Sequence, residues 1–305
     1  MLGNPSCPVP KHELYPEKPI FLSRIDFANS FKEYLRNTDK KIIYLKGDPG
    51  TGKTNFVSYL AQEQDSIVDF RYYTYLPVDK NSPCFTDDDG YYSGRILWIS
   101  TLSRIKKKFE ELNILSELKF PLIYDHLQVS EIRSLVMDYL PIYSEKPGRT
   151  CYIFIDGIDH AARASEKKDT FLSQIPRPES IRGNVKFILV GQSIDNEDIN
   201  RLICDENVNC LNLPWLKEQD IRQLIEYENI EIDNVDLDTL SSSIISVVGN
   251  NALNVIFSIY EIKRMPNPID FDSIISRLTT CGLNEYITKY YEILRMDYLL
   301  NQIYR

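Results

Sequence analysis

"GDPGTGKT", residues 47–54, follows the short apolar run "KKIIYLK" and precedes a stretch with helical periodicity. Its glycines and proline favour a tight turn in which successive backbone N–H groups point inward. Lys53 and Thr54 stand where this turn would pass into the N-terminus of a helix. Backbone donors, a helix N-terminus and a lysine ammonium together form a cradle for phosphate groups. The spacing G-x-x-x-x-G-K-T therefore predicts a phosphate-binding loop, or P-loop.

Apolar runs and helical patterns alternate on both sides of this loop. Buried strands are predicted at 41–47, 66–77, 150–157, 184–193 and 207–214. Helices are predicted at 21–37, from Lys53 onward, at 96–115 and at 130–143. Strands that are nearly all apolar and alternate with helices indicate a parallel sheet covered on both faces. The fold class predicted for this part is α/β.

Beyond residue 213 the pattern changes, because only helical periodicity follows. We expect four parts: an extended, proline-rich arm at 1–20, an α/β domain at 21–213, an all-helical lid domain at 214–265, and a further helical segment at 266–305.

A second polar motif, "CYIFIDGIDH", comes about a hundred residues later, at 151–160. Asp156 follows four apolar residues and is expected at the carboxyl end of a buried strand, where ligands bind in parallel sheets. We predict that Asp156 holds Mg²⁺ through water, while the Thr54 hydroxyl ligates the ion directly. Lys53, Asp156 and Asp159 are the predicted catalytic residues, with Asp159 orienting the attacking water. A helix N-cap is the alternative for Asp159.

Other polar residues allow two interpretations each. Gln192 and Ser193 end the run 186–193 and either contact the γ-phosphate or form an ordinary strand-exit loop. His160 either contacts a neighbouring loop or has a structural role. Arg201 and Arg222 either serve a neighbouring subunit or are surface charges.

Composition excludes several classes of protein. The 305 residues carry a formal net charge of -9, which disfavours binding of the body of the chain to nucleic acid, and the short cluster Arg104, Lys106–Lys108 is interpreted as a solvated helix face. The six cysteines form no C-x-x-C pair, which predicts a reducing, cytoplasmic location. The N-terminus lacks the apolar core of a signal peptide, and no stretch has the length of apolar residues that a membrane span needs.

Taken together, the P-loop, the strand ending in "DGIDH", the run "ILVGQS" at 188–193 and "VVGNNAL" at 247–253 resemble the STAND class of AAA+-related NTPases. NACHT and NB-ARC proteins and many bacterial defence sensors belong to this class. The Asp-Gly form of the second motif is specific, since most other AAA+ proteins carry glutamate directly after the aspartate. "FLSR" at 21–24 is similar to the segment of the class that lies near the nucleotide base, and the resemblance covers about 20–300.

This resemblance implies a P-loop NTPase domain, a helical lid, ATP or ADP with Mg²⁺, and roles in signal transduction or antiviral defence through oligomerisation. "GLNEYITKYYEIL" at 282–294 resembles the start of the winged-helix domain that follows the lid in the class. Two positions depart from the pattern: Gln192 stands where NACHT-like proteins often have arginine, and Asn251 where many have proline. The expected nucleotide-binding residues are Gly47, Asp48, Pro49, Gly50, Thr51, Gly52, Lys53, Thr54, Asn55, Arg24, Gln192 and Pro214.

The expected function is a slowly hydrolysing ATP switch, with nucleotide bound between the α/β domain and the lid and with itself, an effector or a sensor protein as partner. Three alternatives remain: a nucleotide-binding scaffold with little turnover, a DNA-acting AAA+ ATPase, and a small-molecule kinase. The net charge disfavours the second, and the helical half has no role in the third. ATP is favoured over GTP because no N-K-x-D motif is present.

Overall fold

The computed structural model describes residues 24–63, 65–74, 92–113, 120, 126–145, 150–165, 169–232, 235–265 and 271–280. The predicted arm at 1–20, the end of the strand predicted at 66–77, and the segment 282–294 lie outside these residues. Contacts divide the chain into two compact units. The first contains Asp26–Pro49 and Lys53–Leu213, while the second contains Gly50–Gly52 and the chain from Pro214, together with Arg24 and Ile25.

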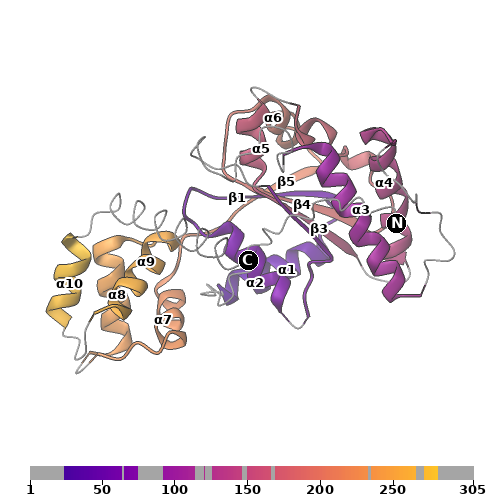
Figure 1. Cartoon of the computed structure of the whole chain (residues 1–305). Helices are drawn as coiled ribbons and strands as arrows, with labels where there is room; N and C mark the ends of the chain where they lie inside the picture. The colour runs from indigo at the N-terminus through magenta and orange to yellow at the C-terminus, as the bar shows by residue number, and fades with distance from the viewer. Residues whose placement is uncertain are drawn as a thin grey trace, which may run out of the picture. The chain divides into compact units, whose positions relative to one another are not determined.

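The first unit is built on an all-parallel sheet, as predicted (Figure 1). Its strands within the described residues are β1 (Ile42–Lys46), β2 (Phe70–Tyr73), β3 (Cys151–Asp156), β4 (Val185–Gly191) and β5 (Val208–Asn212). Their order across the sheet is β2-β3-β4-β1-β5. The strand that leads into the P-loop therefore lies between β4 and β5, and β4 separates it from the strand that ends in Asp156.

The register brings three strand ends to the same edge of the sheet. Lys46, the last residue of β1, pairs with Gly191 at the end of β4. Asp156, the last residue of β3, pairs with Val190. Chain that leaves β1, β3 and β4 therefore enters one common region, where the polar motifs of the sequence meet.

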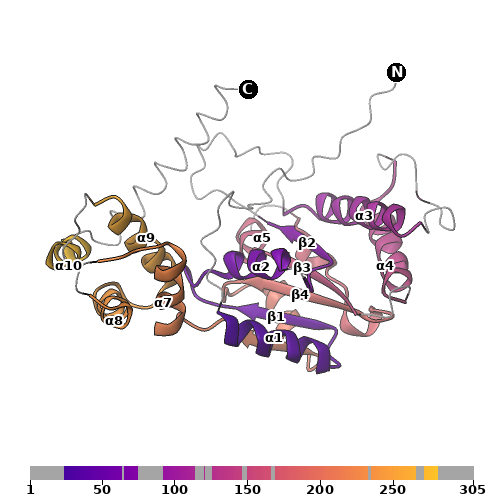
Figure 2. The ribbon, with the colours of Figure 1, turned by 90° about the horizontal axis from the view of Figure 1, so that it is seen from below.

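Alternation along the strands divides the sheet into two apolar faces, because successive side chains point to opposite sides. On one face, Ile43, Phe154 and Ile188 pack against α1 (Ile25–Asn37) and α2 (Lys53–Gln62). On the other, Tyr44 and Phe187 belong to a larger core. That core also includes residues of α3 (Gly94–Glu111), α4 (Val129–Glu145), α5 (Ile158–Ser165) and α6 (Glu197–Ile203). Figures 1 and 2 show this two-sided coverage.

Two short helices and one strand differ from the sequence-based prediction. Strand β2 begins only at Phe70, not at residue 66, because Asp69 marks its entry into the ladder. The Asp69 N–H donates to the Tyr152 carbonyl at 3.1 Å, and its carboxylate accepts from the Tyr152 N–H at 2.9 Å. Helices α5 and α6 were not predicted, because 8 and 7 residues are too few for a clear helical periodicity.

The second unit is helical. Within the described residues it contains α7 (Glu218–Tyr227), α8 (Leu237–Val248), α9 (Ala252–Lys263) and α10 (Phe271–Thr280). These helices share a core of their own that includes Ile225, Leu240, Ile244, Val255 and Ile274. Among the described helices, none alone has the length and hydropathy to cross a membrane, and only α8 and α9 taken together reach that threshold, with a bend of 119° between them.

Lys186 is a buried cation that completes the end of α1. Its Nζ donates to the carbonyls of Leu35 and Thr38, each at 2.6 Å, where the last turn of a helix leaves carbonyls without partners. Lys186→Met is expected to lower the free energy of unfolding by about 1–3 kcal/mol, because these carbonyls lose a charged donor. Urea unfolding checks this, with Lys107→Met on the exposed face of α3 as control; equal midpoints for the two variants would contradict it.

Candidate phosphate-binding site

Strand β1 and helix α2 position the P-loop between them. The Gly47 N–H donates to the Gly191 carbonyl at 3.2 Å, which fixes the start of the loop against the end of β4. Lys53 is the first residue of α2, and its Nζ donates to the carbonyls of Gly47 at 2.7 Å and Asp48 at 2.9 Å. The ammonium is thus held inside the loop that precedes it.

Lys53 lies near charged side chains of both signs. Burial lowers the pKa of the Lys53 ammonium, and Arg163 acts in the same direction. Three carboxylates, Asp159, Asp156 and Asp48, oppose this shift of the pKa. A bound phosphate would add negative charge beside the ammonium and so favour its protonated form.

The tip of the loop, Gly50–Gly52, belongs to the second unit. Gly50 has φ 78° and Gly52 has φ 83°, a conformation that glycine adopts without steric cost. The Gly50 carbonyl accepts from the Leu253 N–H at 3.0 Å, at the start of α9. A Cβ on Gly50 would lie 2.5 Å from Oδ1 of Asn251, so any side chain there would displace the Asn251 side chain. Asn251, the position at which the resemblance implies a proline, is the N-cap of α9.

Arg24 is the second contact of the loop tip. Its Nη2 donates to the Thr51 carbonyl, and its side chain is almost completely buried. Burial lowers the pKa of Arg24 to about 10, against the opposing effect of Asp220. Arg24 therefore supports the backbone of the P-loop, whereas its predicted place near the nucleotide base stays a prediction.

Asp156 and Thr54 meet on the face of the sheet that α2 covers. Asp156 follows Phe154 by two residues and so points to the same face as that core side chain. The Thr54 side chain hydrogen-bonds the Asp156 carboxylate, and Nη2 of Arg71, on β2, lies 3.6 Å from Oδ2. Burial raises the pKa of Asp156, while Arg71 and the Thr54 hydrogen bond act in the opposite direction.

The donor set at Asp156 fits a hydrated Mg²⁺ ion. Oδ2 of Asp156 is buried and has no hydrogen-bond partner among the described residues. A carboxylate and a threonine hydroxyl are the oxygen ligands that Mg²⁺ prefers when substrate phosphates and water supply the rest. The described residues contain no group of three or more His, Cys, Asp or Glu arranged to hold a metal ion, so a metal here would depend on nucleotide and water.

Asp159 connects α5 to the end of β4. It is buried, and its Oδ1 accepts from the Gln192 N–H at 3.2 Å while Oδ2 pairs with Nη2 of Arg163 at 2.8 Å. Helix α5 begins at Ile158, so Asp159 lies inside it and is not its N-cap. The Gln192 carbonyl accepts from the Tyr44 hydroxyl at 2.5 Å. The backbone of Gln192 therefore positions Asp159. Contact of the Gln192 side chain with phosphate stays a prediction.

The remaining predicted residues divide into two groups. Asp48 and Pro49 lie within the P-loop and Asn55 follows it on α2, whereas Pro214 opens the chain of the second unit after the sheet. The two arginines considered for a neighbouring subunit both have acidic partners. Arg201 pairs with Asp198 at 3.2 Å, and Arg222 pairs with Asp238 at 2.7 Å and Glu226 at 3.4 Å.

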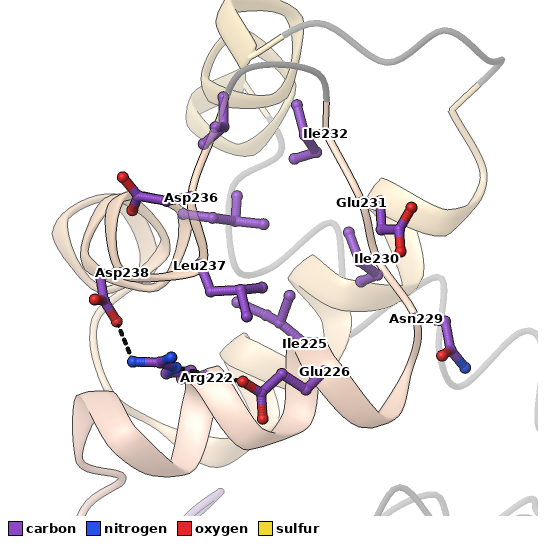
Figure 3. Close-up of a pocket in the computed structure, with 12 residues that line it drawn as sticks. Arg222, Ile225, Glu226, Asn229, Ile230, Glu231, Ile232, Asp236, Leu237 and Asp238 are labelled. Atoms are coloured by element: carbon purple, nitrogen blue, oxygen red, sulfur yellow. Dashed lines mark hydrogen bonds and ion pairs between the residues drawn. The ribbon is translucent and has the colours of Figure 1, made fainter.

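A separate cavity of about 590 Å³ lies within the second unit, between α7, the start of α8 and the segment that joins them (Figure 3). Its floor is apolar and includes Ile225 and Leu237, while Glu226, Glu231 and Asp238 line its rim. None of the predicted phosphate-binding residues lines it.

Two arginines at the site were missed in the sequence. Arg71 interrupts the aromatic strand "FRYY", and Arg163 follows Asp159 by four residues on α5. A charged residue inside an apolar strand was the available signal for Arg71. No signal marked Arg163, because a lone arginine on a short helix is ordinary.

Comparison with known proteins identifies the fold and the family. The solved structure of the Walker-type ATPase PABY2304 of Pyrococcus abyssi matches with a TM-score of 0.54 and 14% identity, over 90% of this chain and 75% of that one. At this identity the likeness shows the fold alone. No match was found among curated protein sequences. Residues 27–192, more than half of the chain, match the family described as Nephrocystin 3, N-terminal.

With its parallel sheet and its resemblance to STAND proteins both confirmed, the chain belongs to the Nephrocystin 3, N-terminal family and is a P-loop NTPase of the NACHT and STAND kind.

Proposed function

We propose that this chain binds ATP with Mg²⁺, hydrolyses it slowly and is the nucleotide-controlled core of a STAND-type signalling or defence protein. The observation that supports this best is the meeting of Lys53, Thr54 and Asp156 at the carboxyl ends of β1 and β3. A cation, a hydroxyl and a carboxylate beside a P-loop are the groups that phosphoryl transfer requires.

The residues of the chain would divide the work as follows. Lys53 exchanges the carbonyls of Gly47 and Asp48 for phosphate oxygens, because a charge-assisted bond to phosphate is stronger than one to a neutral carbonyl. Thr54 and Asp156 hold Mg²⁺, which when bound neutralises negative charge on the phosphates. Asp159 orients the attacking water through the lone pairs that Gln192 and Arg163 leave unused.

Slow turnover is expected from the same contacts. The residue after Asp156 is Gly157 and not glutamate, and the Asp159 carboxylate already accepts from two donors. Position 192 carries glutamine, so an arginine that stabilises the transition state would come from Arg163 or from another subunit.

The Arg163–Asp159 pair also favours the second candidate, a nucleotide-binding scaffold with little turnover. A carboxylate held at 2.8 Å by a guanidinium is a poor acceptor for a proton from water. In this version bound nucleotide stabilises one conformation, and assembly with a second copy or an effector is the output. For both versions we also propose a cytosolic location, as the cysteine pattern of the sequence predicts.

The experiment that tests the proposal has two parts. Nucleotide that stays bound through purification is extracted and identified, and binding of ADP, ATP and GDP is then measured by calorimetry. Adenine nucleotide that is retained through purification, or that binds in calorimetry, supports the proposal. A protein that binds no nucleotide in either measurement contradicts it.

The rate of hydrolysis per subunit is expected to rise with protein concentration, because a neighbouring subunit would complete the site. The check is phosphate release at saturating ATP over a roughly hundredfold range of concentration, beside sedimentation at the same concentrations. A constant measurable rate favours catalysis within one subunit, and no release with tight binding favours the scaffold.

A further inference from the structure

Arg71 is a buried cation next to the predicted metal ligand. It lies on β2, its side chain is 7% exposed, and arginine is almost never buried to this degree without a charged partner. Among the described residues its nearest acceptors are Oδ2 of Asp156 at 3.6 Å and the Thr54 carbonyl at 3.4 Å. Both are residues of the predicted magnesium site.

The register of the sheet explains this position. Arg71 pairs with Phe154 on β3, two residues before Asp156. Its neighbours Phe70 and Tyr72 belong to the core on the opposite face, so Arg71 projects to the face that α2 covers. Strand β2 thereby delivers a guanidinium beneath the first turn of α2, beside Thr54.

The contact between the two charges is close but incomplete. A separation of 3.6 Å is too long for a direct hydrogen bond, and Oδ2 of Asp156 and Nε and Nη1 of Arg71 have no hydrogen-bond partner among the described residues. The guanidinium therefore offsets the buried negative charge without filling the coordination sites of the carboxylate.

We propose that Arg71 is a built-in counter-ion of Asp156 that makes nucleotide binding largely independent of Mg²⁺. This rests on the proposed function, because it concerns the same site. When metal is absent, the charge of Arg71 compensates that of Asp156 and so reduces the repulsion between Asp156 and the phosphates. When Mg²⁺ binds, the charge of Arg71 repels the ion and so weakens its attraction to Asp156. Both effects reduce what the metal adds to nucleotide affinity. Arg71 acts through Asp156 and is a positioning residue.

The test compares the dissociation constant of the fluorescent nucleotide mant-ADP in Mg²⁺ and in EDTA. For the wild type, EDTA is expected to weaken binding by less than about tenfold. In Arg71→Met the ratio of the dissociation constant in EDTA to that in Mg²⁺ is expected to increase by at least about tenfold. Removing a unit charge a few ångströms from Asp156 weakens binding without metal and strengthens the contribution of Mg²⁺. Arg71→Lys keeps the charge and is expected to keep the ratio near the wild-type value.

Lys186→Met is the matched control, because it removes a buried cation from β4 near the opposite ends of the strands. It is expected to lower stability and leave the ratio unchanged. An unchanged ratio in Arg71→Met would overturn the proposal and leave Arg71 a structural residue. If Arg71→Met does not fold, the wild type decides: a loss of binding in EDTA of more than about tenfold contradicts the counter-ion role. If the wild type binds no mant-ADP in either condition, the proposed function itself fails.

Discussion

Lys53→Ala is expected to lower the affinity for ADP and ATP by about a hundredfold or more. The ammonium is the only cation that the P-loop itself, residues 47–54, contributes, and bonds from a charged donor to phosphate contribute about 1.5–3 kcal/mol each. The fold should survive, because the carbonyls of Gly47 and Asp48 lose a neighbour at a partly exposed position and not in the core. Calorimetry with ADP measures the loss directly.

Lys40→Ala is the matched control for this variant. Lys40 lies just before β1, at the amino end of the strand, and its Nζ donates to the Glu206 carbonyl at 3.0 Å. Its removal changes the net charge by the same amount but leaves the P-loop intact. The assignment of the P-loop is wrong if Lys53→Ala binds ADP within about threefold of the Lys40→Ala variant.

Gly157→Ala is expected to lower the free energy of unfolding of the first unit by about 3 kcal/mol or more. Gly157 has φ 83°, and a Cβ there would collide with the Thr74 carbonyl oxygen. That carbonyl cannot move freely, because the Thr74 N–H donates to the Asp156 carbonyl at 2.7 Å. Gly157 itself donates to the Val190 carbonyl at 2.8 Å, so the turn is held on both sides. Relief of the collision would displace Asp156 and weaken nucleotide binding as well.

A second glycine separates the cost of backbone strain from the cost of the collision with Thr74. Gly249 also has a positive φ, 74°, but a Cβ there would meet no atom within 4 Å. Gly249→Ala therefore carries backbone strain alone, about 1–3 kcal/mol. Urea unfolding is followed by tryptophan fluorescence in backgrounds that keep one tryptophan each. Trp215→Phe leaves Trp98 to report on the first unit, and Trp98→Phe leaves Trp215 to report on the second. Equal losses for the two glycine variants would contradict the collision at Thr74.

The sheet and the P-loop could be predicted because their signals are local. Strands β1, β3 and β4 are continuous apolar runs, and "GDPGTGKT" carries its conformation in its glycines. The position of Asp156 at a strand end followed from the same pattern. These features need only the residues next to them in the chain.

The roles of Arg71 and of the Gln192 backbone could not be predicted, because each depends on a residue far away in the sequence. Arg71 reaches Asp156 only because β2 pairs with β3, and the register of that pairing is a tertiary property. Asp159 was predicted as a water-orienting residue without its partners. Its contact with the Gln192 N–H needs β4 to end beside α5, and no periodicity reports that.

The order β2-β3-β4-β1-β5 also has a consequence for how the chain folds as it is made. Both neighbours of β1 come late, since β4 ends at Gly191 and β5 at Asn212. At ordinary synthesis rates, β1 with its P-loop waits roughly 7–30 s for the first of these partners. During that interval a strand with two unpaired edges and an apolar face on each side is exposed, which is the condition that favours aggregation. We therefore expect the nucleotide cradle to be among the last parts of the first unit to form.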